Sequence, residues 1–177
     1  MKIVKLCLIA IPLIISAMYA VMYSGILNVA ADEPHSDLVY WLLDTTRENS
    51  IERAAKKIEV PDLSDPDLLL TGGVDYEFMC SGCHLKPGKN ESDMSVGLYP
   101  SPPNLTLKVE EHDGHKHSDS SQTYRKNFWV IKHGIKASGM PAWGKTHDDE
   151  RIWAMVAFLE KLPELSHQQY QILTANE

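Results

Sequence analysis

The chain has 177 residues, of which 44% are hydrophobic and 23% are charged, and its formal net charge is −7. This length accommodates one globular domain and a smaller segment, but not two full domains. The excess of acidic residues argues against a nucleic-acid binder, because no overall basic field is present to neutralise phosphates. The 3 cysteines are too few for a disulfide framework.

The N-terminus contains a long apolar run. No residue between Leu6 and Leu27 is charged, and Lys2 and Lys5 precede the run. As a helix this segment would be roughly 33 Å long, which is enough to cross a hydrocarbon core of about 30 Å. The preceding lysines orient the N-terminus toward the cytoplasm and the remainder of the chain to the outside. We therefore expect residues 1–31 to form a cytoplasmic tip and a transmembrane anchor.

A cleaved signal peptide is the alternative for this segment. Val29-Ala30-Ala31 is an acceptable small-residue cleavage site. However, the apolar run is longer than the roughly 7–15 residues of a signal-peptide core. The length of the run therefore favours an anchor that is retained.

The exported part of the chain is predicted to be all-α. Apolar residues recur at helical spacing over Ser36–Glu59, which predicts an additional amphipathic helix within a segment spanning 32–65. The remainder, 66–177, is predicted to be one helical domain with a C-terminal tail. Its expected elements are a helix starting at Ser64-Asp65-Pro66 and ending near Cys80, a long loop over 85–122, a helix over Gln122–Lys132 and a last helix starting at Asp148.

The strongest chemical signal is Cys80-Ser81-Gly82-Cys83-His84. This C-x-x-C-H pattern is typical of covalent haem c attachment. Two thiols three residues apart on one helical turn can add to the two vinyl groups of a haem, and the next residue brings an imidazole to the iron. We therefore expect Cys80 and Cys83 to bind one haem c and His84 to ligate its iron.

Two other uses of this cysteine pair stay open. A thiol–disulfide pair usually lies at a helix start after a strand, and no strand is predicted here. A zinc site would need two further ligands, which His112, His115 and His117 could supply. The same three histidines could bind copper or zinc loosely, but a solvated loop insertion is the favoured interpretation, because the three residues have nothing rigid to converge on.

The exported region resembles the class I, monohaem c-type cytochromes, especially the membrane-anchored bacterial kind, over residues 66–163. Gly72, Tyr76 and Cys80 follow that family's spacing of glycine, aromatic residue and first haem cysteine. The resemblance implies a small helical domain wrapped around one haem. It also implies that Gly72 and Tyr76 cross a C-terminal helix near Met155 and Phe158.

Pro102-Pro103-Asn104-Leu105 is similar to the P-N-L loop of that family. The resemblance implies that the carbonyl of Pro103 accepts a hydrogen bond from Nδ1 of His84, which would fix the imidazole tautomer. It also places Leu105 among the cofactor-binding residues. A simple proline-rich turn is the alternative interpretation.

Met140 and His133 are the candidates for the second axial ligand. Met140 lies in Gly139-Met140-Pro141-Ala142-Trp143, which is similar to the distal loop of small bacterial cytochromes c. A thioether is a soft ligand, and Met/His ligation raises the iron potential. We therefore expect His84 and Met140 to be the metal ligands, with Trp143 packing near the haem edge.

These expectations combine into a functional prediction. The chain is predicted to be a periplasmic, one-electron carrier held by a single-pass anchor in a bacterial inner membrane, and not an enzyme in its own right. Its expected partners are the membrane and redox proteins, including an oxidase or dehydrogenase, with no nucleic acid and no small-molecule substrate. A basic stretch over Gln122–His147 would steer an acidic partner toward the haem.

Three other functions stay open at this point. The chain could be a fixed cytochrome c subunit of a larger membrane redox complex, for which the Ser36–Glu59 helix offers a docking element. It could be a haem enzyme or gas sensor with an open sixth position. It could also be a thiol oxidoreductase or a metal carrier without haem.

Overall fold

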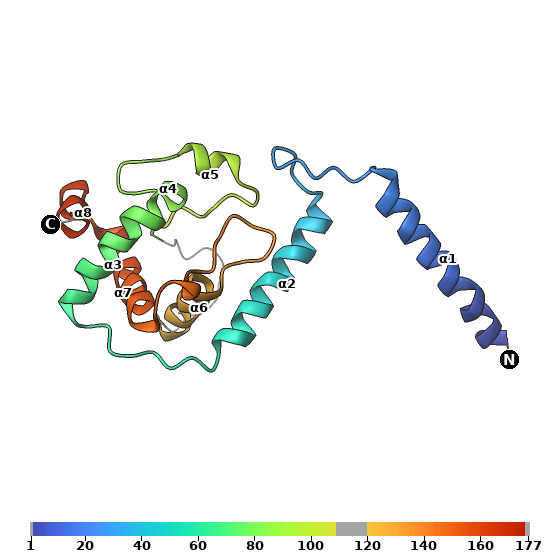
Figure 1. Cartoon of the computed structure of the whole chain (residues 1–177), viewed down its shortest axis with the longest axis horizontal. Coiled ribbons are helices and arrows are strands. Elements are labelled where there is room, and N and C mark those ends of the chain that lie inside the picture. The colour runs from blue at the N-terminus through green and yellow to red at the C-terminus, as the bar shows by residue number, and fades with distance from the viewer. Residues whose placement is uncertain (1, 109–119, 176–177) are drawn as a thin grey trace. The chain divides into compact units, whose positions relative to one another are not determined.

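The computed structural model describes residues 2–108 and 120–175, and these ranges contain helices and no strand (Figure 1). The chain divides into two compact units, Met1–Glu33 and Pro34–Glu177. The predicted all-α class is therefore confirmed for the described residues. The elements are α1 Lys2–Ser24, α2 Asp37–Ala55, α3 Pro66–Met79, α4 Ser81–His84, α5 Asp93–Gly97, α6 Ser120–His133, the 3₁₀ turn η1 Trp143–Lys145, α7 Asp149–Lys161, the 3₁₀ turn η2 Leu162–Glu164, and α8 His167–Leu173.

The first unit consists of α1 and the segment that follows it. The helix ends at Ser24, whose hydroxyl donates a hydrogen bond to the carbonyl of Val21, and Gly25 then takes a positive φ of 67°. Glycine favours this left-handed conformation at a helix end because it has no Cβ. Among the described residues, none of the helices combines the length and the hydropathy that crossing a membrane requires.

The second unit is built on the crossing of α3 and α7. Asp65 caps α3 by accepting a hydrogen bond from the amide of Asp67, and Pro66 occupies the first turn, as the sequence predicted. A Cβ added to Gly72 would lie 2.0 Å from the carbonyl oxygen of Ala154. The two backbones are therefore in direct contact, and only glycine fits at this position of α3.

Side chains on either side of this contact stabilise the crossing. The Tyr76 and Phe158 rings have centroids 5.4 Å apart and both are buried. Asp75 is 4% exposed and accepts hydrogen bonds of 2.6 Å from Nε and Nη2 of Arg151. Such a two-point pair fixes orientation as well as distance. The crossing predicted from Gly72 and Tyr76 is therefore confirmed.

The additional helix α2 lies against α6 (Figure 1). Its C-terminal half buries Ile51 and Ala55, and it continues through Asn49-Ser50 without a break. Its N-terminal half, in contrast, carries large apolar side chains that are exposed. Only half of the predicted amphipathic helix is therefore used for packing within the described part of the chain.

Two short helices lie where the sequence analysis expected none. The predicted loop over 85–122 contains α5, which begins with a capping box between Ser92 and Ser95. The predicted C-terminal tail contains α8, which has its own capping box and buries Tyr170 to 2% exposure. The C-terminal segment is therefore part of the hydrophobic core, because Tyr170 packs beside Tyr76 and Phe158.

The Gly72 contact leads to a stability prediction. We expect Gly72→Ala to lower the free energy of unfolding by about 3 kcal/mol or more. The added methyl group would clash with the backbone of α7 at Ala154 and would push α3 and α7 apart. Gly97→Ala is the matched control, since nothing lies within 4 Å of a Cβ there. Chemical denaturation followed by circular dichroism measures both variants. Equal stability of G72A and G97A would contradict the close crossing.

Candidate cofactor site

A cavity of about 510 Å³ lies between α2, α4, α6 and the loops that follow α5 and α6. Its volume is in the range of small-molecule and cofactor sites. Its lining is mostly apolar and includes all seven residues that the sequence analysis assigned to the cofactor, namely Cys80, Cys83, His84, Pro103, Leu105, Met140 and Trp143. Three separate parts of the sequence, 80–84, 103–105 and 140–143, therefore meet around one space.

The start of the haem motif coincides with the end of α3. Cys80 caps α3, and the short helix α4 carries Cys83 and His84. Nδ1 of His84 lies 2.9 Å from the carbonyl oxygen of Pro103, the partner that the resemblance implies. A proton on Nδ1 leaves Nε2 as the nitrogen whose lone pair can bind a metal.

Burial keeps this imidazole neutral. It lowers the pKa of His84 more than the hydrogen bond to Pro103 raises it. A neutral imidazole is the form that serves as a metal ligand. The position of the ring is further fixed through its backbone, since the amide of Leu105 donates a 3.2 Å hydrogen bond to the His84 carbonyl.

The turn after the motif depends on Tyr76. Its hydroxyl donates a hydrogen bond of 2.6 Å to the carbonyl of Leu85. Leu85 is 4% exposed and has a positive φ of 70°, an unusual conformation for a residue with a Cβ. The tyrosine of the helix crossing thus also holds the chain as it leaves His84.

Met140 lies in a loop with several backbone hydrogen bonds. The amide of Ile135 donates to its carbonyl at 3.2 Å, and its own amide donates to the hydroxyl of Ser138 at 3.1 Å. Gly134 approaches this loop so closely that a Cβ would lie 2.7 Å from the Met140 carbonyl oxygen. Contacts within the protein therefore hold this loop in place without any contribution from a cofactor.

His133 occupies a different position. It is exposed at the end of α6, does not line the cavity, and has its ring centroid 5.1 Å from that of Trp129. Met140, by contrast, lines the cavity together with His84. The structure therefore places His84 and Met140 around the same cavity and leaves His133 outside its lining.

The uses of the cysteine pair without haem can be compared with the structure. Burial, followed by the charges of Asp75 and Cys83, raises the pKa of the Cys80 thiol to about 12. Reactive redox cysteines instead have a lowered pKa. His112, His115 and His117 lie outside the described residues, and within the described ranges no three His, Cys, Asp or Glu side chains form a metal-binding group.

The helix α2 contributes four residues to the cavity lining, and none of them was predicted from the sequence. They are Tyr40, Arg47, Glu48 and Ile51. Burial tends to raise the pKa of Glu48, but hydrogen bonds from Lys126 and Arg47 outweigh it and hold this pKa below its ordinary value. The only sequence signal of these four α2 residues is the helical pattern over Ser36–Glu59. That pattern shows neither which element the helix packs against nor which of its faces points there.

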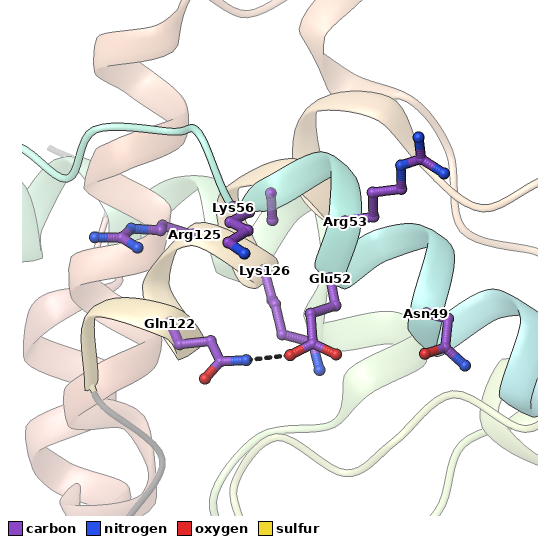
Figure 2. A pocket seen from close by; sticks show the side chains of 8 residues that line it. Asn49, Glu52, Arg53, Lys56, Gln122, Arg125 and Lys126 are labelled. Carbon is purple, nitrogen blue, oxygen red and sulfur yellow. Dashed lines mark hydrogen bonds between the residues drawn. The ribbon is translucent and has the colours of Figure 1, made fainter.

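A second cleft, of about 530 Å³, lies between the C-terminal half of α2 and the start of α6 (Figure 2). There Nε2 of Gln122 donates a 2.6 Å hydrogen bond to Glu52, and Lys126 lies beside it. Of the predicted cofactor-binding residues, none lines this cleft. Its contacts fasten α2 to α6, and so fix the α2 residues that line the first cavity.

Two members of the predicted basic stretch have acidic partners in the structure. Lys126 pairs with Glu48 at 3.2 Å, and Lys132 pairs with Asp149 at 2.5 Å. The positive charge available to an electron-transfer partner is therefore smaller than the sequence suggests. Arg125, Lys136 and Lys145 have no ion pair within the described ranges.

Glu77, near the end of α3, links the segment after the haem motif to the helix α8. Its carboxylate accepts hydrogen bonds from Lys86 at 2.5 Å and from the Tyr170 hydroxyl at 2.6 Å. Burial tends to raise the pKa of Glu77, but these hydrogen bonds outweigh it and hold the pKa below its ordinary value of 4.5. The ionised carboxylate therefore stabilises the folded state above that pH and ceases to do so as pH falls through the lowered pKa.

This linkage predicts a pH-dependent stability difference. At neutral pH we expect Glu77→Gln to lower the free energy of unfolding by about 1 to 2 kcal/mol relative to the wild type. The difference should narrow as pH falls below 4.5, because the folded wild type then loses the charged hydrogen bonds. Urea titrations across that pH range measure it. Glu91→Gln, at an exposed position, is the control, and a pH-independent difference for E77Q would refute the assignment.

The residues of the first cavity fit a covalently attached haem. Two thiols, an imidazole with Nδ1 engaged and a thioether line one mostly apolar space, and the cations among its described lining residues are Arg47 and Lys126. This donor set combines the groups that attach haem c with the soft and borderline ligands that bind its iron. Both cations are hydrogen-bonded to Glu48 in this structure.

One comparison with known proteins gives a match. The family model described as cytochrome C oxidase, cbb3-type, subunit III matches residues 68–159, which is more than half of the chain. The match begins within α3 and ends within α7, so it includes the haem motif, the Pro103 loop and Met140. It leaves α2 and α8 outside. No curated protein and no solved structure matches the chain significantly.

Proposed function

Because this chain belongs to the cytochrome c oxidase cbb3-type subunit III family, we propose that it is a membrane-anchored, periplasmic one-electron carrier with His84 and Met140 as axial ligands. The family binds haem c covalently, so the chain carries covalent haem c and serves haem-based electron transfer. The observation that supports the ligand assignment is the single cavity that Cys80, Cys83, His84 and Met140 line together.

Each of these side chains has a defined task in the proposed mechanism. The thiols of Cys80 and Cys83 would hold the haem through two thioether bonds, and the Pro103 carbonyl would keep the proton of His84 on Nδ1. When bound, the haem supplies one-electron chemistry at its iron. The mostly apolar lining would limit the contact of a bound haem with water, and so the rearrangement of solvent on electron transfer.

With His84 and Met140 as ligands, no position remains for a substrate. This arrangement favours an electron carrier over a haem enzyme or gas sensor, which needs an open sixth position. It also explains why the loop from Gly134 to Met140 is held by backbone contacts, since a thioether ligand must be positioned by the chain that carries it.

The ligand proposal predicts a clear contrast between two variants. Met140→Ala should lose the near-infrared Met–Fe charge-transfer band of the oxidised protein and should bind carbon monoxide when reduced, because the sixth position opens. His133→Ala should retain the band and exclude carbon monoxide. Optical spectra of both purified proteins measure this. Loss of the band in H133A, or its persistence in M140A, would contradict the assignment.

The anchor is proposed from the uncharged run Leu6–Leu27 and the lysines before it. We expect the haem-stained chain to stay in membranes after an alkaline carbonate wash and to be digested by protease added to spheroplasts. Leu13→Lys combined with Ile14→Lys should release it, since each central charge costs about 2.5 to 3.5 kcal/mol. Leu13→Ala combined with Ile14→Ala is the control. Wild-type protein in the soluble fraction would contradict this proposal.

A second candidate function is supported by the family description itself. Members of this family are described as a subunit of a cbb3-type oxidase, so the chain could be a fixed subunit of such a membrane complex. Purification in a mild detergent through a tag on the C-terminus separates the two possibilities. Stoichiometric recovery of other oxidase subunits supports the fixed subunit, whereas recovery of the haem protein alone supports the free carrier.

A further inference from the structure

The first turns of α2 carry an unusual surface. Six consecutive residues, Leu38 to Leu43, are large and apolar, and their exposure ranges from 42% at Val39 to 71% at Leu38. Six residues cover more than one full turn of a helix, so the segment is apolar on all sides and not along one stripe. We call Leu38–Leu43 the apolar collar. A helix that is apolar all round belongs in an apolar environment.

The collar is held firmly by the haem domain. Before it, the amide of His35 donates a 3.0 Å hydrogen bond to the Tyr99 hydroxyl, and the two rings lie with centroids 5.1 Å apart. After it, Glu48 and Glu52 are bonded to Lys126 and Gln122 of α6. The collar thus lies on a helix that is fixed at both ends, and its exposure does not result from a frayed terminus.

We propose that the apolar collar inserts into the interfacial layer of the lipid bilayer. This inference rests on the proposed membrane anchor and deepens it. Leu38 follows the end of the apolar run at Leu27 by eleven residues, which limits their separation to about 40 Å. The collar therefore stays within reach of the surface from which the anchor would emerge.

The composition of the collar favours lipid over a protein partner. Tyr40 and Trp41 lie among aliphatic residues, and these two residue types are enriched where membranes meet water. The flanking charges, Asp37 and Asp44, are both acidic, so anionic lipid headgroups contribute nothing to the attraction. Attachment by burial of apolar surface alone should be insensitive to salt.

This attachment would orient the cofactor. Tyr40 belongs to the collar and also lines the haem cavity. With the collar in the bilayer interface, the cavity lies directly beside the membrane surface. A redox partner embedded in the same membrane then meets the haem at a constant height, and the search for it is confined to rotation and diffusion in the plane.

The test separates the collar from the anchor. A protease site is placed between Asn28 and Glu33 of the full, haem-loaded chain, which is reconstituted into phosphatidylcholine vesicles, cleaved and floated on a density gradient. The wild-type haem domain should float after cleavage, at low and at high salt. Trp41→Ser combined with Leu42→Ser should reduce the floating fraction about tenfold or more, since two large apolar side chains are lost. Leu70→Ser combined with Ile172→Ser, at exposed apolar positions outside the collar, should not.

Each other outcome has a defined meaning. Release of the cleaved wild-type domain from vesicles overturns the collar proposal, and retention on native membranes alone would assign the collar to a protein partner instead. Concentration-dependent dimers of the cleaved domain that do not float would overturn it in favour of a second copy. The uncleaved W41S/L42S chain must still float if the anchor is correct, so the failure of the anchor is seen separately. Leu38→Ser serves as a second variant if W41S/L42S does not fold.

Discussion

At Gly72 the helix that carries the haem motif touches the backbone of α7, and the other parts of the cavity take their positions from this contact. Tyr76, one turn later, packs on Phe158 and binds the Leu85 carbonyl, so the chain leaving His84 is fixed by the same crossing. Leu105 then bonds to the His84 carbonyl, which brings the Pro103 carbonyl to Nδ1 of His84. A missing side chain on one helix thus determines the position of an imidazole twelve residues away.

The cavity also depends on residues outside the matched family segment 68–159. The helix α2 supplies Arg47 and Glu48 to the lining and is fastened to α6 through Lys126 and Gln122. The helix α2 thus forms one side of the cavity although it lies outside the matched segment, and the same helix presents the apolar collar. Cofactor environment and membrane attachment would be linked through one rigid element.

Much of this architecture follows from local sequence rules. The start of α3 was predicted from the cap at Ser64-Asp65-Pro66, and a cap depends only on neighbouring residues; the start of α7 at Asp148 was predicted from the apolar stripe that follows it. The Gly72 crossing and the Pro103, Leu105, Met140 and Trp143 positions in the cavity were predicted from the resemblance to the class I cytochromes c. The helices α5 and α8 were missed because helices this short show no clear periodicity. Only α8 carries the usual sequence signature of a capping box, Ser166 followed by Gln169, whereas the box of α5 uses Ser92 and Ser95. The α2 residues of the cavity were missed because only tertiary packing reveals which side of a helix faces a neighbour.

One measurement tests the central claim, which is that Cys80 and Cys83 bind a single haem whose iron is ligated by His84. It is the optical spectrum of the membrane fraction, oxidised and then dithionite-reduced, with a denaturing gel stained for haem alongside. The account predicts a sharp c-type α-band on reduction and haem staining at the mass of the full chain, 19.9 kDa. A chain that expresses at this mass without covalent haem would contradict the account and return the cysteine pair to thiol or metal chemistry.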